Sequence, residues 1–388
     1  MIDLILIDND EKLLKFVNQA SKSDILCVDT EFMREKTYYP KLCLLQFQTR
    51  LETYILDPFI VDNLSPLKKL FLDKEVVKVF HAATQDIEML HNELGCMPTP
   101  IFDTQIAAGL TDGLNQPGLS TLLGASIGVK ISKSEGFSDW SIRPLTKSQV
   151  KYAAEDVVYL PQLYDYQINK MKERGQESWL QDEFLALEDA SRFCIVPEDR
   201  YKHLKHATRL SKKQLCSARE IASWREIKAQ RADVPRKWIL SDEQIVEICR
   251  KNPTTVDALF SVRGVSKRVD LTSARQILDA IKVANKCDPS DWPVIAEANL
   301  NEENVDEIVP LLAAVVLKRA KENGVSQALI ASNNDLVDFA RGHFESSPLM
   351  SGWRKNLVGE ELKRLLDGEI NLSCNGCSLE IKNESVQK

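Results

Sequence analysis

A short apolar run that ends in two acidic residues constrains the fold of this chain more than any other feature. Residues 25–28 (Ile-Leu-Cys-Val) have the continuous apolar character of a central strand, and Asp29 and Glu31 follow at its end. Because residues i and i+2 of a strand point to the same side, the two carboxylates are predicted to project together. Such a pair repels itself unless a cation intervenes, and a divalent ion meets that need. A strand that runs into an exposed acidic turn is the commoner outcome for this pair alone.

Two other segments supply further candidate ligands. Asp86 follows a predicted strand over residues 76–80 and lies in the first turn of a predicted helix. Tyr152 and Asp156 are spaced i, i+4 and therefore share one helix face. A phenol one turn from a carboxylate can hold a metal-bound water while the carboxylate binds the metal. A core tyrosine beside a surface acid is the structural alternative.

The first 195 residues are predicted to be α/β. Strands precede helices along this part of the chain, which predicts a mixed sheet covered by helices. Pro161 is expected to divide or kink the last long helical segment. The predicted strands are 25–28, 42–47, 53–56 and 76–80, and the predicted helices follow Ser65-Pro66 and cover 84–94, 103–110, 119–127 and 146–172.

No strand pattern is found after residue 200, so this region is predicted to be all-helical. It contains a faint internal repeat at an offset of 91 residues, which indicates two helical modules of roughly 80 residues each. The matched positions are Ala229, Val234, Ile239, Ser241, Ile245, Val246, Glu247, Ile248 and Arg250 against Ala320, Val325, Ile330, Ser332, Leu336, Val337, Asp338, Phe339 and Arg341.

The formal net charge of −7, taken alone, argues against a nucleic-acid partner. The charge is unevenly placed, however: residues 200–240 carry 12 Lys and Arg against 3 Asp and Glu, a net of +9 within an acidic chain. A solvated helix face with a linker explains such a run most often, and an electrostatic footprint for phosphates is the functional alternative. The charge count does not decide between them.

Cysteine usage and apolar runs bear on location. The nine cysteines are scattered and lie mostly in apolar runs, which favours reduced thiols in a cytoplasmic protein over a disulfide framework. The longest apolar stretch, near residues 308–317, is too short to span a bilayer, and no secretory signal is expected at the acidic N-terminus. Cys374 and Cys377 have no partner pair in metal-ligand spacing, so no zinc is expected there.

Taken in order, these segments resemble the DEDD exonuclease superfamily, its tyrosine-bearing branch, and most closely the ribonuclease D family. The resemblance covers residues 1–195, and the ordered set of motifs is far more specific than any one of them. The matching motifs are Val28–Phe32 with Arg34–Pro40 and Leu42–Gln46, then His81–Asp86, then Asp139-Trp140 with Arg143–Leu145, and finally Tyr152–Asp156.

The helical modules resemble HRDC domains, which this family carries in tandem after its exonuclease domain. The second module departs from the pattern in charge, since residues 300–380 contain 8 basic and 13 acidic residues, and packing against the catalytic domain is an alternative role for it. The expected divisions are an exonuclease domain at 1–195, a basic linker at 196–210, HRDC-type domains at 211–288 and 292–380, and a polar tail at 381–388.

The resemblance implies an RNase H-like core and hydrolysis of phosphodiester bonds with two divalent ions, Mg²⁺ or Mn²⁺, about 4 Å apart. All-carboxylate ligands suit these ions better than zinc. Asp29 is expected to bridge both ions, Glu31 and Asp156 to complete one site, and Asp86 to serve the second through water. Tyr152 is expected to orient the attacking water rather than remove its proton, since a free phenol titrates near 10. Attack at the last phosphate releases 5′-mononucleotides.

The implied substrate is RNA with a free 3′ end, such as a tRNA precursor, bound by a protein expected to be monomeric. His81 is more often a structural histidine than a ligand, and base stacking by Phe32 and Met33 competes with core packing. The remaining candidate substrate-binding residues are Trp140, Arg143, Lys212, Lys213 and Arg219.

Three other functions remain open. A nucleic-acid-binding protein with a weak or inactive catalytic domain is disfavoured because all four carboxylates and Tyr152 are present. A helicase accessory role follows from the presence of HRDC modules on RecQ helicases, but the chain has no P-loop to power unwinding. A 3′–5′ DNA exonuclease is the alternative enzyme, because carboxylates that bind metal do not read a 2′-hydroxyl.

Overall fold

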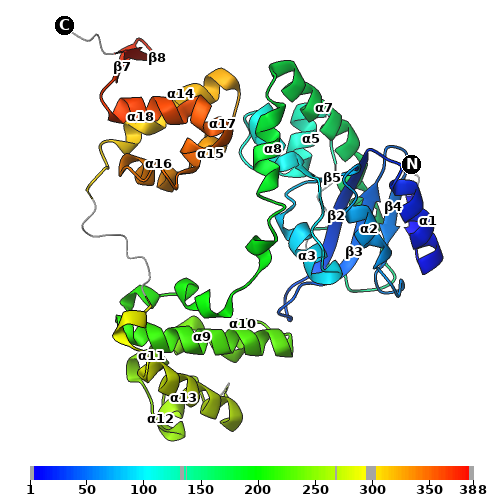
Figure 1. Ribbon diagram of the computed structural model, residues 1–388. Coiled ribbons are helices and arrows are strands. Elements are labelled where there is room, and N and C mark those ends of the chain that lie inside the picture. Colours follow the sequence, from blue (N-terminus) through cyan, green and yellow to red (C-terminus); the bar gives the residue numbers. More distant parts are fainter. Residues whose placement is uncertain (1–3, 132–134, 137, 267–268, 294–302, 384–388) are drawn as a thin grey trace. The chain divides into compact units, whose positions relative to one another are not determined.

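The computed structural model describes residues 4–131, 135–136, 138–266, 269–293 and 303–383 (Figure 1). The chain forms two compact units. The first unit contains residues 1–32, 42–190 and 302–388, and the second contains residues 33–41 and 191–301. Within the described residues, every helix is too short or too polar to cross a membrane.

The exonuclease domain is built on one six-stranded sheet, and the predicted mixed sheet is confirmed. The strand order is β1-β4-β3-β2-β5-β6, with β3 and β4 antiparallel and the β1–β4, β2–β5 and β5–β6 pairs parallel. The short strands β1 and β6 were not expected, because four and three residues give too little pattern to recognise. The strands are β1 Leu4–Ile7, β2 Ile25–Met33, β3 Lys41–Gln48, β4 Thr53–Leu56, β5 Val77–Phe80 and β6 Ile101–Asp103.

Helices pack on this sheet through apolar faces. The helix at Asp10–Ala20 buries Phe16, whose ring centroid lies 4.7 Å from those of Phe47 and Tyr54. The expected division near Pro161 is confirmed, since one helix ends at Val158 and the next begins at Leu160. The helices of this domain are α1 Asp10–Ala20, α2 Pro66–Phe71, α3 Thr84–Leu94, α4 Thr104–Thr111, α5 Leu119–Ile127, α6 Lys147–Val158, α7 Leu160–Arg174 and α8 Glu177–Leu185.

The second unit is helical, and its core begins earlier than expected. The segment 196–210 is not a linker: it forms short 3-10 turns whose apolar side chains join the core of this unit, including Tyr201, Leu204, Ala207 and Leu210. Basic residues alternate with these apolar residues, which hides the apolar period in the sequence. The elements are η1 Ala190–Phe193, η2 Pro197–His203, η3 Ala207–Arg209, α9 Lys212–Ala232, α10 Arg236–Ile239, α11 Asp242–Lys251, α12 Val256–Phe260, α13 Leu271–Asn285 and η4 Pro289–Asp291.

The C-terminal module repeats part of this arrangement. At the offset of 91 residues, α10 corresponds to a helix at Gln327–Ile330, and the N-cap serines Ser241 and Ser332 each form a capping box. Its helical elements are α14 Val309–Asn323, α15 Gln327–Ile330, α16 Asn333–Ala340, η5 Pro348–Met350, α17 Gly352–Arg354, a π-helical turn η6 at Lys355–Gly359 and α18 Glu360–Leu366.

The expectation that no strand follows residue 200 is wrong at the C-terminal end. Strands β7 (Ile370–Asn375) and β8 (Ser378–Asn383) pair as an antiparallel hairpin, so the predicted tail at 381–388 begins inside a strand. The two-residue turn is Gly376-Cys377, between the paired residues Asn375 and Ser378, and Gly376 has a φ of +61°. Glycine at the first position of a two-residue turn is a hairpin signal, and polar side chains on both strands obscured it. Residues 384–388 lie outside the described part of the chain.

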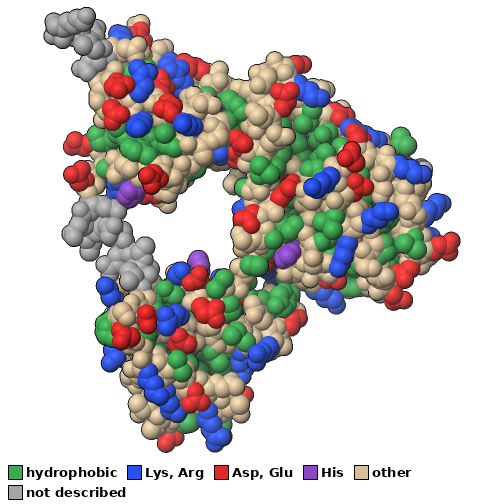
Figure 2. Space-filling model, viewed as in Figure 1, with side chains coloured by type: hydrophobic (Ala, Val, Ile, Leu, Met, Phe, Trp, Pro, Cys, Tyr) green, Lys and Arg blue, Asp and Glu red, His purple; other side chains and the backbone are tan. Residues whose placement is uncertain are grey.

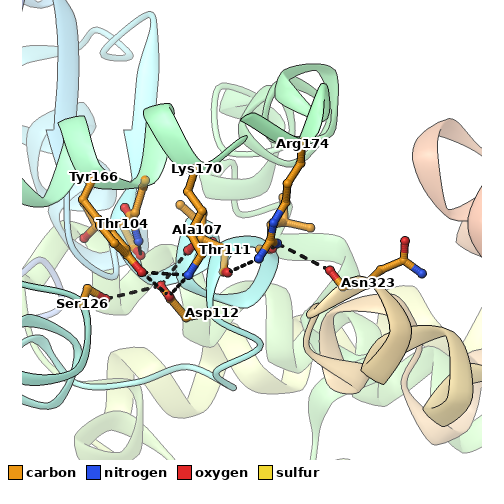
Figure 3. Close-up of polar contacts among 11 residues, drawn as sticks. Thr104, Ala107, Thr111, Asp112, Ser126, Tyr166, Lys170, Arg174 and Asn323 are labelled. Atoms are coloured by element: carbon orange, nitrogen blue, oxygen red, sulfur yellow. Dashed lines mark hydrogen bonds and ion pairs between the residues drawn. The ribbon is translucent and has the colours of Figure 1, made fainter. Parts of the chain in front are cut away.

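The C-terminal module packs against the exonuclease domain, as the alternative role predicted. The backbone N–H of Ser326 donates to the carbonyl of Gly109 at 2.6 Å, and the Trp179 and Trp353 rings stack with centroids 4.8 Å apart. Figure 3 shows Arg174 of α7 between the end of α4 and Asn323 of α14. Its guanidinium lies 3.5 Å from the backbone carbonyl oxygen of Asn323. In the same view Asp112 accepts hydrogen bonds from Tyr166, Lys170 and Ser126 and joins α4, α5 and α7.

Candidate active site

Strand β2 carries the first two carboxylates of the acidic cluster. Asp29 and Glu31 project from the same side of this strand, and Asp156 of α6 joins them. One carboxylate oxygen from each of the three lies within 4.8 Å of the others, close enough to share a metal ion. The fold therefore brings the Asp29–Glu31 pair of the strand together with Asp156 of the helix, which lies 125 positions after Glu31 in the chain.

Asp86 is held beside this cluster by the residue between the first two acids. It lies in the first turn of α3 and is buried. The Thr30 hydroxyl donates to one of its carboxylate oxygens, and the charge of Asp29 acts on its carboxyl group. Thr30 was not identified from the sequence, because nothing in a strand pattern distinguishes a hydroxyl that orients a distant carboxylate.

Burial and neighbouring charges raise the pKa values of all four carboxylates in the cluster. Burial and the charge of Asp156 raise the pKa of Asp29 well above its ordinary value. Burial, then Asp29, Asp156 and Asp86, raise the pKa of Glu31 to about 10. Burial raises the pKa of Asp156 to about 7, although a hydrogen bond from Tyr152 opposes the shift. Burial and Asp29 also raise the pKa of Asp86. The donor set and its charge therefore fit divalent cations.

Tyr152 lies beside Asp156 on α6, as the spacing predicts. It is hydrogen-bonded to that carboxylate, and burial together with the charges of Asp156, Glu31 and Asp29 raises the pKa of its phenol. The ring centroid of Trp140 lies 6.0 Å from that of Tyr152. Since the phenol stays protonated at neutral pH, Tyr152 can donate a hydrogen bond but cannot accept a proton as a base.

Two residues expected to contact substrate have structural roles instead. Trp140 is only 2% exposed and packs near Tyr152, so it cannot stack on a base. Arg143 forms a two-point ion pair with Asp57, at 2.6 and 2.9 Å. Its remaining N–H groups donate to the carbonyls of Trp140, Ile142 and Cys43, so all five donors are used. The sequence identified an important loop but not its buried partner Asp57.

Other candidates near the cluster differ in exposure. Phe32 and Met33 are half-buried, which fits neither a fully packed core position nor a free stacking platform. The Nδ1 atom of His81 lies 3.0 Å from the Thr104 hydroxyl oxygen, and burial lowers its pKa to about 4, so it is a neutral, hydrogen-bonded histidine as expected.

Asp103 is a second residue that the sequence analysis missed. It is buried at the N-cap of α4 and accepts hydrogen bonds from the backbone N–H groups of Ala82 and Ala83, at 3.1 and 2.8 Å. Ala82 has a φ of +61°, unfavourable for a residue with a side chain, and these bonds stabilise the turn that leads to Asp86. An aspartate between a strand and a helix is a recognisable N-cap signal, but its contact with residues 20 positions away is not.

The basic segment 200–240 is less available than its charge suggests. At least five of its twelve cations form ion pairs within the described residues: Arg200 and Arg236 with Glu226, Lys202 with Asp199, Arg219 with Glu220, and Arg225 with Asp242. Lys212 and Lys213 are exposed at the start of α9, whereas Arg219 is half-buried. On the face that Figure 2 shows, basic side chains of this unit lie among acidic ones rather than in an unbroken patch.

Comparisons with known proteins agree with this architecture. The 3′–5′ exonuclease family model matches residues 4–172, and the HRDC domain model matches residues 214–281 but not the second module. The chain is 35% identical to ribonuclease D of Acidiphilium cryptum over 379 residues, 97% of this chain and 96% of the relative. It is also 35% identical to ribonuclease D of Gluconacetobacter diazotrophicus over 376 residues, 96% of this chain and 95% of the relative.

A solved structure extends the similarity to three dimensions. The crystal structure of Escherichia coli RNase D, described as an exoribonuclease involved in structured RNA processing, superposes with a TM-score of 0.84 at 26% identity. The similarity covers 95% of this chain and 99% of the bacterial structure. Together with the near full-length identity above, these results show that the chain belongs to the ribonuclease D family of 3′–5′ exoribonucleases.

Proposed function

We propose that Asp29, Glu31, Asp86 and Asp156 hold two divalent ions, Mg²⁺ or Mn²⁺, and that Tyr152 acts with them in hydrolysis from the 3′ end of RNA. The exonuclease fold and the acidic cluster imply dependence on a divalent metal. The observation that carries the proposal is the close approach of three half-buried carboxylates, whose pKa values are raised by burial and by neighbouring carboxylates. Oxygen-only ligands favour Mg²⁺ or Mn²⁺ over zinc.

Each side chain has a separate task in this proposal. Asp29 would serve as the shared ligand, because its charge acts on both Glu31 and Asp86. Asp86, which accepts a hydrogen bond from Thr30, would hold the second ion. When bound, the ions supply Lewis acidity that activates water and offsets charge at the phosphate. Tyr152 keeps its proton, which it donates in a hydrogen bond to Asp156, and its oxygen accepts a hydrogen bond from the attacking water and so orients it. We propose that Glu31 also contacts the terminal ribose.

We further propose that the substrates are structured RNAs with short 3′ extensions, such as tRNA precursors, and that the products are 5′-mononucleotides. The support is the family itself and the description of the Escherichia coli relative as an enzyme of structured RNA processing. A DNA exonuclease is the competing proposal, because carboxylate ligands do not distinguish ribose from deoxyribose.

The experiment compares 3′-extended tRNA with a single-stranded DNA of matched length, each digested with Mg²⁺ or Mn²⁺. Asp29→Asn removes the charge of the proposed shared ligand, whereas Asp62→Asn makes the same change at an exposed position away from the cluster. We expect Asp29→Asn to lose at least about 100-fold in rate, since even residues that only orient metal ligands cost 10–100-fold. Equal rates for wild type and Asp29→Asn would rule out the assignment, and faster digestion of DNA would favour the competing proposal.

A further inference from the structure

The connection between β2 and β3 belongs to the helical unit and not to the exonuclease domain. Residues 33–41 begin with the last residue of β2, the strand that carries Asp29 and Glu31, and end with the first residue of β3. Within the helical unit they pack on α9. The catalytic strand of the proposed site is therefore joined, only two residues after Glu31, to a segment held by another unit.

The backbone of this segment is fixed by the end of α9. The N–H groups of Tyr38 and Tyr39 both donate to the same carboxylate oxygen of Asp233, each at 3.0 Å. Asp233 is the C-cap residue of α9, with a φ of +47°. One side chain at the helix terminus therefore determines the path of two consecutive residues in the connection.

The side chain of Tyr38 is also held by hydrogen bonds to residues of α9. Its hydroxyl donates to the carboxylate of Glu226, a residue of α9 that is fully buried, and accepts from the amide of Gln230 at 3.1 Å. Arg236 and Arg200 also contact the Glu226 carboxylate, at 3.3 and 3.5 Å. Hydrogen bonds to an ionised, buried carboxylate are stronger than those between neutral groups, so Glu226 holds the Tyr38 hydroxyl firmly in one position. We call this contact the anchor of the β2–β3 connection.

This anchor uses two cations of the basic segment. Arg200 and Arg236 pair with Glu226, whose carboxylate accepts the hydrogen bond from Tyr38. The same helix α9 begins at Lys212, next to Lys213, and both are exposed cations proposed to contact RNA. One helix thus carries the proposed RNA contact at its start and the anchor of the β2–β3 connection near its end.

We propose that Tyr38 is a positioning residue for the nuclease reaction: it fixes the β2–β3 connection to α9, so that the grip of the helical unit on RNA is transmitted to the strand carrying Asp29 and Glu31. The inference rests on the proposed function of those two carboxylates. It predicts that the anchor matters for long RNA substrates and not for the chemical step itself. A dinucleotide, with a single phosphodiester bond, has no further phosphates for the helical unit to hold.

The test measures kcat/KM of full-length Tyr38→Phe on 3′-extended tRNA and on a dinucleotide. We expect a loss of about tenfold on the tRNA, in line with a hydrogen bond to a charged partner, and a change within about twofold on the dinucleotide. Tyr39→Phe is the matched control, because the side chain of Tyr39 is 42% exposed. A similar loss on both substrates, or no loss on either, would overturn the inference.

A second variant keeps the test decisive if Tyr38→Phe unfolds at the assay temperature, which thermal unfolding would show. Glu226→Gln preserves an acceptor oxygen for Tyr38 but removes the charge shared with Arg200 and Arg236. It is expected to reduce activity on tRNA selectively, and equal losses on the two substrates would again overturn the inference. Absence of metal-dependent RNA hydrolysis by the wild type would instead refute the proposed function.

Discussion

The acidic cluster and the basic segment differ in the charge of the residues that surround them. In the cluster, the neighbours that raise the pKa of Asp29 and Glu31 are other carboxylates. In residues 200–240, by contrast, at least five of the twelve cations form ion pairs within the protein, as Arg225 does with Asp242 at 2.8 Å. The fold gathers like charges where we propose that metal ions bind, and it pairs opposite charges in part of the segment that the sequence offered as a possible phosphate footprint.

The difference shows what a charge count can and cannot reveal. A count of +9 over 41 residues describes composition, whereas the surface that RNA meets depends on which cations stay exposed. Seven of the twelve cations, including Lys212 and Lys213, are exposed. The four carboxylates are a small part of the total acidity, yet their arrangement carries the chemistry.

The largest effect that would sharpen this comparison is expected at Tyr152. Tyr152→Phe removes the hydroxyl proposed to orient water but leaves the carboxylates, so kcat on 3′-extended tRNA should fall on the order of 100-fold even at saturating Mn²⁺, which offsets the lost hydrogen bond to Asp156. Tyr166→Phe is the control, because its hydroxyl donates to Asp112, outside the cluster. A Tyr152→Phe enzyme as active as Tyr166→Phe would show that the phenol has no part in the chemistry.

The second prediction concerns pH. Because the pKa of Asp156 is raised to about 7 and that of Glu31 to about 10, protons compete with metal, and apparent Mn²⁺ affinity should fall about tenfold per unit between pH 10 and 7 and more steeply below pH 7, where a second proton must be displaced. These raised pKa values also affect folding, because the folded protein holds protons that the unfolded chain has already lost. The metal-free protein is therefore stabilised most by these groups at a pH below the ordinary pKa of a carboxyl group, and it loses this stability as pH rises through 7.

Thermal unfolding with EDTA at pH 5 to 8, repeated with excess Mn²⁺, checks both signs. We expect the metal-free protein to melt at a lower temperature as pH rises, and Mn²⁺ to restore stability most at pH 8. In Asp29→Asn the dependence should be shallower, because one of the repelling charges is gone. Metal-free stability that rises over this pH range would contradict the electrostatic account. So would a fall that is as steep in the variant as in the wild type.

The smallest effect is expected in the basic segment. Replacing Lys212 and Lys213 with Gln should weaken RNA binding several-fold and reduce the salt slope by about 1 to 2. Lys15→Gln with Lys22→Gln on the exonuclease domain removes the same charge from exposed positions. If fluorescence titrations at several salt concentrations gave the same slope for both double variants, α9 would be an ordinary solvated helix.

The sequence predicted the parts of the site that depend on local geometry. Strand and helix periods are short-range, so Asp29 with Glu31, and Tyr152 with Asp156, were identified as pairs, and the order of motifs added Asp86. The mixed sheet and the helical region after residue 200 also followed from local patterns.

Contacts between distant segments were not predictable in this way. The pairing of Arg143 with Asp57, 86 residues away, replaced an expected substrate contact. The Tyr38–Glu226 anchor joins residues 188 positions apart, and neither spacing nor composition indicates it. Two features that depend on local sequence were also not predicted, because polar residues interrupt their apolar pattern. They are the buried turns within 197–210 and the C-terminal hairpin.

The central claim is that the acidic cluster binds two catalytic metal ions, and Mn²⁺ binding measured by electron paramagnetic resonance tests it most directly. With a 5′-mononucleotide present, the wild type should bind two Mn²⁺ per chain, and Asp29→Asn, which lacks the shared ligand, should bind fewer. Equal Mn²⁺ stoichiometry for the two proteins would contradict the account.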